Sequence, residues 1–144
     1  MRGFSNGMKL TLTILTPQAQ VYSGEADEII VPTANGEIGI LPNHVGLLAQ
    51  ILPGELRVKN AGKTISFAIL GGYLEVSKNT VNVLGDYAIR AEDIEVAKAE
   101  QAKVRAEKAK QEKVSKEDFA TIEADLRRSL LELKVANRRR SRPQ

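Results

Sequence analysis

The residues of this chain that could do chemistry are few. The only histidine, His44, could serve as a general base, but no Gly-x-Ser-x-Gly turn and no compelling nucleophile accompanies it. We interpret His44 as a loop residue that makes packing and hydrogen-bond contacts. Asp27 and Glu28 are adjacent on an expected strand, where neighbouring side chains point to opposite faces. We therefore interpret them as solvated charges at a strand edge and not as an acid/base pair.

Nucleotide-binding and metal-binding motifs are also missing from the sequence. Gly36-Glu37-Ile38-Gly39 has two glycines but lacks the third glycine and the following helix of a dinucleotide-binding loop, and no Gly-x-x-x-x-Gly-Lys-Ser/Thr loop occurs. The absence of cysteine excludes disulfides, thiolate zinc sites and a cysteine nucleophile. A single histidine excludes zinc sites that need two imidazoles. We therefore predict no catalytic residue, no metal site and no required cofactor.

The strongest charge signal is an arginine run near the C-terminus. Arg138 and Arg139 belong to this run, and Arg127 and Arg128 lie about three turns earlier in the same expected helix. The run could form a basic helical module that binds nucleic-acid phosphates or scaffolds another molecule. Against nucleic acid, Phe119 is the only aromatic residue after residue 90 that could stack on a base. Alternatively, the run is a tail exposed to solvent, or it docks on an acidic protein surface.

The distribution of charge, glycine and proline divides the chain in two. Residues 1–90 carry seven basic and seven acidic residues, which leaves 14 basic and 11 acidic residues for 91–144. All 11 glycines and four of the five prolines lie before residue 91, and both residue types are poor in helix interiors. We predict one domain over 8–90 and a second over 91–140. Residues 1–7 are predicted to be a leader ahead of an alternative start at Met8, and 141–144 a disordered tail.

Neither part has a membrane or export signal. No apolar run approaches the roughly 20 residues that span a bilayer, and nothing reads as a secretory signal. We expect a water-soluble protein of an intracellular or matrix-type compartment.

The first part is predicted to be an all-β sandwich or barrel of about ten strands. Residues 10–14 alternate between apolar and β-branched polar side chains, and Asn35-Gly36 is a strong two-residue hairpin signal. Gly71-Gly72 inside a strand run indicates a bulge or a close backbone approach. Short strands at this spacing, without helical periodicity between them, favour a sandwich. The strands that we can locate are 10–14, 28–32, 37–41, 55–59, 64–70, 73–76 and 80–84.

The second part is predicted to be an antiparallel two-helix hairpin, which makes the fold class α+β. The first helix begins at Glu92 or Asp93, runs to Lys113 and places four alanines on one side: Ala99, Ala102, Ala106 and Ala109. Ser115 and Asp118 resemble a capping box for the second helix. The second helix has an apolar seam predicted to contain Phe119, Ile122, Leu126, Leu130 and Leu133.

The composition of the two helix faces predicts a weakly held hairpin. A buried alanine methyl contributes about 0.8 kcal/mol, whereas a buried leucine contributes roughly 1.5–3 kcal/mol. The alanine face therefore offers a thin interface, and a hairpin held in this way can exchange between two docking surfaces. Our hypothesis is that the C-terminal part is mobile and the N-terminal part rigid.

Several segments are similar to a known family. The stretch from Gly36 to His44, Gly-Glu-Ile-Gly-Ile-Leu-Pro-Asn-His, and the stretch Gly71-Gly72-Tyr73-Leu74-Glu75-Val76 resemble the epsilon subunits of F-type ATP synthases. Leu15-Thr16-Pro17, Val21-Tyr22 and Arg90-Ala91-Glu92-Asp93-Ile94 fit the same family. The resemblance covers about residues 8–140. Its glycine-to-histidine segment is specific, whereas the helices alone are not.

The resemblance implies a non-catalytic subunit of the central rotary stalk. The sandwich would bind the gamma subunit and the ring of c subunits, through residues such as Glu37, Leu41, Pro42 and His44, and help to couple rotation to proton or sodium flux. The hairpin would inhibit ATP hydrolysis when it extends along gamma to the acidic loops of the beta subunits. We expect Arg127, Arg128, Arg138 and Arg139 to contact that surface. The complex would lie at the cytoplasmic face of the bacterial inner membrane, or the equivalent stromal side, with this chain attached only peripherally.

Some members of that family also bind ATP through an Ile/Leu-Asp-x-x-Arg-Ala motif. The matching stretch here begins at Ile94 and ends at Ala99, with Glu95 in place of Asp and Lys98 in place of Arg. Lysine lacks the planar fork of arginine that suits bidentate contacts. The resemblance therefore implies at most a weak regulatory ATP site at Ile94, Glu95, Lys98 and Ala99.

Overall fold

The computed structural model describes residues 8–141, with side chains through Arg139. The chain divides into two compact units, one up to Arg90 and one from Ala91 onward. The leader predicted over 1–7 and the last three residues of the predicted tail lie outside the described residues. Ser141, which was predicted to begin the tail, is instead the last residue of a helix.

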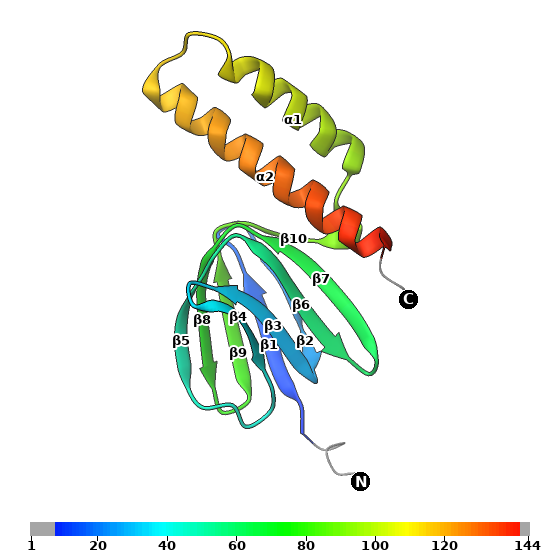
Figure 1. Ribbon diagram of the computed structural model, residues 1–144. Coiled ribbons are helices and arrows are strands. Elements are labelled where there is room, and N and C mark those ends of the chain that lie inside the picture. The colour runs from blue at the N-terminus through cyan, green and yellow to red at the C-terminus, as the bar shows by residue number, and fades with distance from the viewer. Residues whose placement is uncertain (1–7, 142–144) are drawn as a thin grey trace. The chain divides into compact units, whose positions relative to one another are not determined.

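Ten strands form the first unit, as expected (Figure 1). Seven of them match the predicted strands to within one residue at each end. Three strands carry little sequence signal: β2 has mostly exposed or half-buried residues and an internal glycine, β5 has only five residues, and β10 has only three. The strands are β1 (Leu10–Leu15), β2 (Gln20–Ala26), β3 (Glu28–Thr33), β4 (Gly36–Ile40), β5 (Leu47–Ile51), β6 (Gly54–Asn60), β7 (Lys63–Ile69), β8 (Gly72–Ser77), β9 (Thr80–Gly85) and β10 (Ala88–Arg90).

The strands pair in one continuous order that runs from β10 to β2. The order is β10-β7-β6-β3-β5-β8-β9-β1-β2, with β4 paired to β3. β1 and β9 pair in parallel, with Thr11 opposite Thr80. Tyr22 of β2 packs edge-on against Phe67 of β7, with ring centroids 5.4 Å apart, and the Arg90 guanidinium of β10 lies 5.6 Å from the centre of the Tyr22 ring. Side chains from the two ends of the order therefore pack together, so that the sheet folds over one core.

The core of the sandwich is almost entirely aliphatic. Alternate residues of β1, Leu10, Leu12 and Ile14, are fully buried while Thr11 between them is exposed, as the period-two pattern predicts. Phe67 is the one aromatic residue in the buried cluster that the structure describes. The others are Leu10, Leu12, Ile14, Ala26, Ile29, Val31, Ile40, Ile51, Leu56, Val58, Ile69, Leu74, Val76, Val81 and Val83.

Two glycine positions fix tight backbone geometry. The predicted hairpin turn is displaced by one residue: Thr33 pairs with Gly36, so that Ala34 and Asn35 form the loop and Gly36 begins β4 with φ of +101°. Gly72, with φ of +136°, lies so close to β9 that an added Cβ would meet the Leu84 carbonyl oxygen. The close backbone approach predicted for the glycine pair is therefore confirmed.

The second unit is the predicted helical hairpin, with a later start than expected. It comprises a 3₁₀ turn, η2 (Ala91–Asp93), and two antiparallel helices, α1 (Val96–Lys110) and α2 (Lys116–Ser141) (Figure 1). Glu95 has extended backbone angles, φ −86° and ψ 98°, so the chain leaves helical geometry between η2 and α1. This break accompanies burial of Ile94. The Ser115 hydroxyl accepts a hydrogen bond from the Asp118 N–H at 3.1 Å, as the capping box predicted.

The seam between α1 and α2 differs from the prediction on one side only. Ala99 and Ala106 are buried and Ala102 and Ala109 half-buried, as predicted for α1. On α2, however, Phe119 and Leu130 are exposed, and the seam follows another row: Ile122, Leu126, Ser129, Leu133 and Ala136. This row has spacings of four and three residues throughout, which keep it on one side of the helix. Ser129 thus takes the place that was expected for Leu130, and Ala136 extends the row beyond the predicted seam. Both residues are small, so the interface is thin.

Candidate functional site

One outer face of the sandwich exposes large hydrophobic side chains on four neighbouring strands. Leu15 of β1 lies opposite Leu84 of β9, Leu84 opposite Tyr73 of β8, and Gln50 of β5 opposite Tyr73. Leu48 lies on the same side of β5, two residues from Gln50. Tyr73 is 57% exposed, Leu84 55% and Leu48 74%. We call Leu15, Leu48, Tyr73 and Leu84 the apolar face. Exposed apolar patches of this kind mark interaction sites in soluble proteins.

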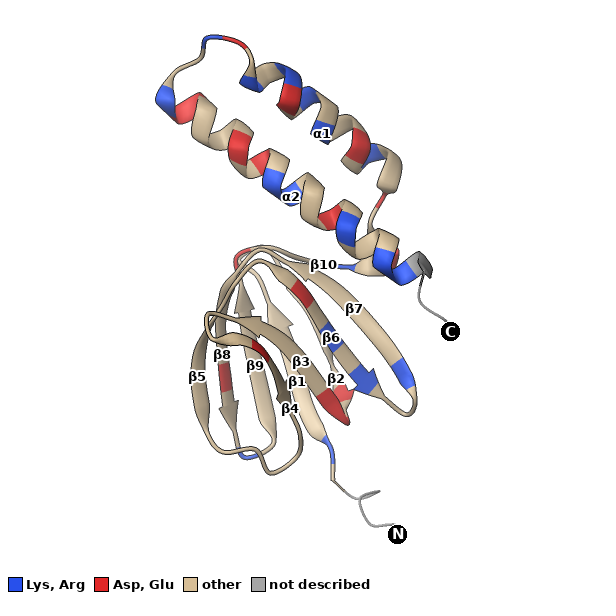
Figure 2. Ribbon diagram, in the orientation of Figure 1, with Lys and Arg blue, Asp and Glu red and all other residues tan. Residues whose placement is uncertain are grey.

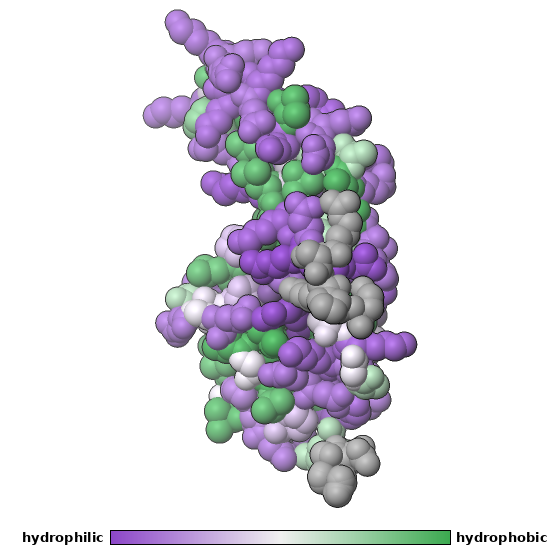
Figure 3. Space-filling view, turned by 45° about the vertical axis from the view of Figure 1, so that its right-hand side comes forward, coloured by the Kyte–Doolittle hydropathy of each residue, from purple (hydrophilic) through white to green (hydrophobic). Residues whose placement is uncertain are grey.

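Charged residues are sparse on the strands of the apolar face and frequent on the helices. Much of β5, β8 and β9 is free of charged residues in Figure 2, and hydrophobic side chains gather on one flank of the sandwich in Figure 3. Along α1 and α2, by contrast, charged residues recur on every turn.

The loop that follows β4 places three of the predicted contact residues together. Leu41 is exposed and Pro42 and His44 are half-buried. The Asn43 N–H donates to the Asn79 side-chain oxygen at 2.6 Å, which ties this loop to the turn between β8 and β9. The His44 N–H donates to the Leu41 carbonyl at 3.1 Å, and its Nδ1 donates to the Val45 carbonyl at 2.8 Å. The loop therefore holds a defined shape beside the strands of the apolar face.

Glu37, the fourth predicted contact residue, lies elsewhere. It is at the start of β4, four extended residues or roughly 13 Å from Leu41. Its carboxylate accepts a hydrogen bond from Arg57 of β6 at 2.8 Å. The structure thus brings Leu41, Pro42 and His44 together and leaves Glu37 in an ion pair on other strands.

Sequence reasoning missed the apolar face, although a signal for it exists. A strand with one buried face should alternate between apolar and polar residues. Three strands instead have apolar residues at both the inward and the outward position: Leu47-Leu48, Tyr73-Leu74 and Val83-Leu84. One member of each pair is buried or half-buried and the other is exposed. Apolar residues in the outward phase of three strands that pair with one another would have predicted the face.

The four predicted arginines of α2 separate into two pairs. Residues 11 apart lie about three full turns apart, so Arg127 and Arg138 share one side and Arg128 and Arg139 share another. Arg128 lies 3.8 Å from Asp125, and Arg139 lies 3.8 Å from Glu92. Arg127 and Arg138 are exposed and align with Lys134. We call Arg127, Lys134 and Arg138 the basic stripe.

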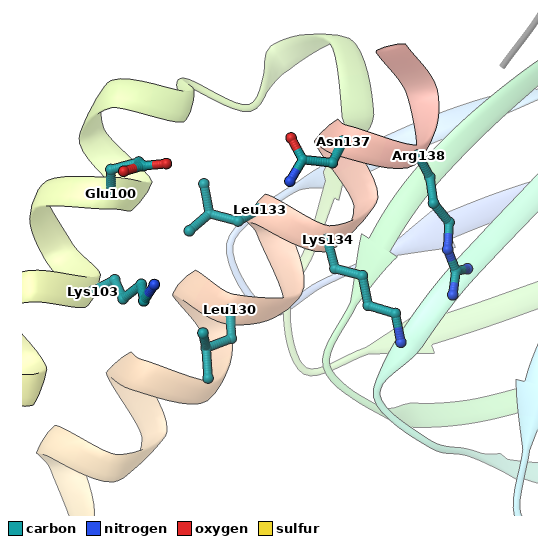
Figure 4. Close-up of a pocket in the computed structure, with 7 residues that line it drawn as sticks. All are labelled: Glu100, Lys103, Leu130, Leu133, Lys134, Asn137 and Arg138. Atoms are coloured by element: carbon teal, nitrogen blue, oxygen red, sulfur yellow. The ribbon is translucent and has the colours of Figure 1, made fainter. Parts of the chain in front are cut away.

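A hollow of about 670 Å³ lies beside the basic stripe, between the two helices. Figure 4 shows Lys103 and Asn137 extending toward Leu133, while Lys134 and Arg138 lie side by side along α2. Its lining consists of Glu100, Lys103, Leu130, Leu133, Lys134, Asn137 and Arg138. The hollow therefore has an apolar floor and a mainly basic rim.

The residues of the ATP-type motif lie at the start of the helical unit, in the break before α1 and in its first turn. Ile94 and Ala99 are buried within the helical unit. Glu95 and Lys98 are 66% and 76% exposed at their side chains and lie 3.4 Å apart, so they pair with each other.

The two adjacent carboxylates, Asp27 and Glu28, take part in structural ion pairs. Lys9 binds Asp27 at 2.6 Å and the Ala61 N–H donates to the same carboxylate at 2.8 Å. The hydrogen bond from Lys9, followed by that from Ala61, lowers the pKa of Asp27. Glu28 lies 3.8 Å from Lys59. These contacts join strand ends and turns.

Residues 8–141 contain neither a metal-binding cluster nor a membrane-spanning helix. In this range, no three side chains of the metal-binding types gather closely enough to hold an ion. Neither described helix is long and apolar enough to cross a membrane.

Comparison with known families assigns both units. The beta-sandwich domain of the ATP synthase delta/epsilon chain matches residues 9–91, and the long alpha-helix domain of the same chain matches residues 92–137. The ATP synthase epsilon chain of Herpetosiphon aurantiacus is 42% identical over 135 residues, which cover 94% of this chain and 99% of the relative. The epsilon chain of Dehalococcoides mccartyi is 43% identical over 137 residues, with 94% and 98% covered.

Solved structures share the fold. A chain of the Euglena gracilis mitochondrial ATP synthase, in a structure of OSCP, F1 and the c-ring, superposes with a TM-score of 0.64 at 23% identity. The match covers 93% of this chain and 81% of that one. A chain from the central stalk and c-ring of the Tetrahymena thermophila enzyme gives a TM-score of 0.57 at 17% identity, covering 89% and 96%.

Proposed function

We propose a rotor role for this chain, which belongs to the ATP synthase delta/epsilon family and matches epsilon chains over 94% of its length. It acts as a non-catalytic subunit of the central stalk, helps to couple rotation to ion flux and inhibits ATP hydrolysis through its helices. It requires no resident cofactor and lies at the cytoplasmic face of the membrane, or the equivalent stromal side, only through the complex. The observation that carries the proposal is an exposed apolar face on the sandwich combined with a basic stripe on α2.

The apolar face is the surface on which the gamma subunit docks. Leu48, Tyr73 and Leu84 are each more than half exposed on neighbouring strands, so a partner that covers them removes a continuous apolar surface from water. The neighbouring loop offers the exposed side chain of Leu41 and a turn held by Asn43 and Asn79. That loop contacts the c-ring.

The basic stripe is the part of the hairpin that contacts the acidic surface of the beta subunits. Arg128 and Arg139 already face Asp125 and Glu92 within the helical unit. Arg127 and Arg138 lie on the side of α2 that carries Lys134, so three cations point the same way. Clustered positive charge speeds association with an acidic partner and sets its orientation.

The small interface between α1 and α2 favours separation of the two helices. The α1 side of the seam consists of alanines, each of which buries a single methyl worth about 0.8 kcal/mol. Lys110 and Glu123 join the helices across the seam at 3.1 Å, but both side chains are about 40% exposed, so this ion pair adds little. An alternative docking surface can therefore compete for the helices.

Removal of the helical unit tests the inhibitory role. Deleting residues 92–144 should raise ATP hydrolysis by the reconstituted complex and leave its assembly intact. The paired variants Arg127→Gln/Arg138→Gln and Arg128→Gln/Arg139→Gln refine the test, since they remove the same charge from the same helix. We expect the first pair to weaken inhibition more than the second. If deletion of residues 92–144 left the rate of ATP hydrolysis unchanged, the inhibitory role would be refuted.

Copurification with gamma tests the docking of the sandwich. Tyr73→Gln/Leu84→Gln should reduce recovery of this chain with gamma, whereas Lys63→Gln, at an exposed position of β7 outside the apolar face, should not. A circular dichroism spectrum and melting curve would verify that both variants remain folded. Retention of gamma by the first variant would refute this docking surface. DNA or RNA binding that falls steeply with salt, without recovery of gamma, would instead favour a nucleic-acid module.

A further inference from the structure

The last strand of the sandwich is short and lies immediately before the helical unit. β10 has only three residues, and the helical unit begins at the next residue, Ala91. Among the described strands, β10 pairs with β7 alone, because it stands at one end of the strand order. A three-residue strand at an edge makes few backbone hydrogen bonds. Side-chain contacts must therefore contribute to its attachment.

The side chain of Arg90 supplies such contacts. Its guanidinium lies over two rings, 5.6 Å from the centre of Tyr22 and 5.9 Å from the centre of Phe67. A guanidinium within about 6 Å of an aromatic ring centre is attracted to the face of the ring, and more strongly where water is excluded. Phe67 is fully buried, and Arg90 and Tyr22 are half-buried. We call Arg90, Tyr22 and Phe67 the aromatic clasp.

The aromatic clasp joins three strands. Phe67 lies opposite Arg90 in the pairing of β7 with β10, whereas Tyr22 belongs to β2 at the other end of the strand order. The rings of Tyr22 and Phe67 pack edge to face, with centroids 5.4 Å apart. A Cβ added to Gly24 would lie 2.9 Å from the Tyr22 hydroxyl oxygen, so this glycine makes room for the ring. The clasp therefore connects β10 to β2 as well as to β7.

We propose that Arg90 is a positioning residue that anchors the helical unit to the sandwich. The aromatic clasp keeps β10 on β7 while the helices change position, so that the movement begins at Ala91 and leaves the sheet intact. Without the guanidinium, β10 separates from β7 and the helical unit moves from residues 86–87 instead. The anchoring role rests on the mobile hairpin of the proposed function. The clasp itself belongs to the isolated chain, so it is tested separately from inhibition.

Hydrogen exchange of the full chain, resolved by residue, measures the attachment of β10. The Leu70 N–H donates to the Tyr87 carbonyl at 3.0 Å, so the alternation of an antiparallel pair places the next reciprocal hydrogen bonds between Ala68 and Ile89. The amides of Ala68 and Ile89 therefore report on this attachment. We expect Arg90→Gln to accelerate their exchange about ten-fold and to leave the amides of β1 and β9 unchanged. Arg90→Lys, which retains a cation, should accelerate it less.

A double-mutant cycle identifies the ring as a partner of the guanidinium. Tyr22→Leu removes the ring and keeps an apolar side chain, so the double variant with Arg90→Gln should accelerate exchange at Ala68 and Ile89 by clearly less than the product of the single effects. Lys63→Gln, which removes a cation from the exposed start of β7, is the control and should leave both amides unchanged.

Four results would each overturn the proposal. The first is that Arg90→Gln exchanges like the unaltered chain, and the second is that it accelerates exchange equally in β1 and β9. The third is that Arg90→Lys has as large an effect as Arg90→Gln, since the cation would then contribute nothing. The fourth is that the effects of Arg90→Gln and Tyr22→Leu multiply in the double variant, since the two side chains would then act independently.

Discussion

Two neighbouring leucines of α2 provide a sharp test of how the hairpin is held. Leu133 is 8% exposed in the seam and Leu130 is 46% exposed beside it. The substitutions Leu133→Ala and Leu130→Ala remove the same three carbon atoms from the same helix, and alanine keeps the helix propensity high in both. Any difference between them therefore reports on burial against α1.

The exposed fractions set the expected sizes of the two effects. At about 0.8 kcal/mol per buried methylene, three carbons scaled by the buried fraction give about 2.2 kcal/mol for Leu133→Ala and about 1.3 kcal/mol for Leu130→Ala. A residual cavity at Leu133 adds to the first value. At 1.36 kcal/mol for each factor of ten, amide exchange in the hairpin should accelerate about 40-fold or more and about 10-fold, respectively.

Hydrogen exchange of the full chain, resolved by residue, measures both effects. We expect the amides of α1 and α2 to exchange faster than those of the sandwich in the unaltered chain, because the alanine seam buries little apolar surface. Both substitutions should leave β1 to β9 unchanged. Equal acceleration by the two variants, or equal protection of sandwich and helices before substitution, would refute the reasoning.

Two further predictions concern the sandwich. Gly72→Ala should destabilise it by more than about 2 kcal/mol, because φ is +136° and the added Cβ meets the Leu84 carbonyl oxygen; Gly62→Ala, at φ +80° with open space around the Cβ, should cost only about 1 kcal/mol in the same denaturant titration. Asp27 has a lowered pKa in the folded state, so its contribution is present above the unfolded value and is lost as the pH falls through the folded value. Asp27→Asn should therefore flatten the loss of stability below about pH 4 in acid denaturation, whereas an unchanged acid limb would contradict the role given to its contact with Lys9.

Local patterns sufficed for most of the fold. Alternation in residues 10–14 predicts β1 because one face of the strand is buried against a core and the other is not. β2 escaped prediction because the Tyr22–Phe67 contact and pairing along β1 hold it, and neither is visible in its own sequence. The hairpin at Gly36 shows a subtler limit: Asn-Gly signals a turn, but the pairing of Thr33 with Gly36 decides which residues occupy it.

The candidate site was less predictable than the fold. The spacing of Leu130 and Leu133 predicted that both would be buried against α1. In the structure the alanines of α1 cover Leu133 and leave Leu130 exposed. Helical periodicity places Arg127 and Arg138 on one side of α2 and Arg128 and Arg139 on another. The contact of Arg139 with Glu92 of η2 could not be read from the sequence of α2 alone. Surfaces depend on which strands or helices become neighbours, and that is tertiary information.

The parallel pairing of β1 with β9 fixes the order in which the molecule can be completed. Thr11 of β1 pairs with Thr80 of β9. During synthesis β1 therefore lacks one of its neighbouring strands until almost the whole sandwich has been made. Contacts so distant along the chain slow folding, since a long loop must close before they form. The helical unit follows the sandwich in the chain. A nascent chain can therefore complete its apolar face before its helical hairpin has formed.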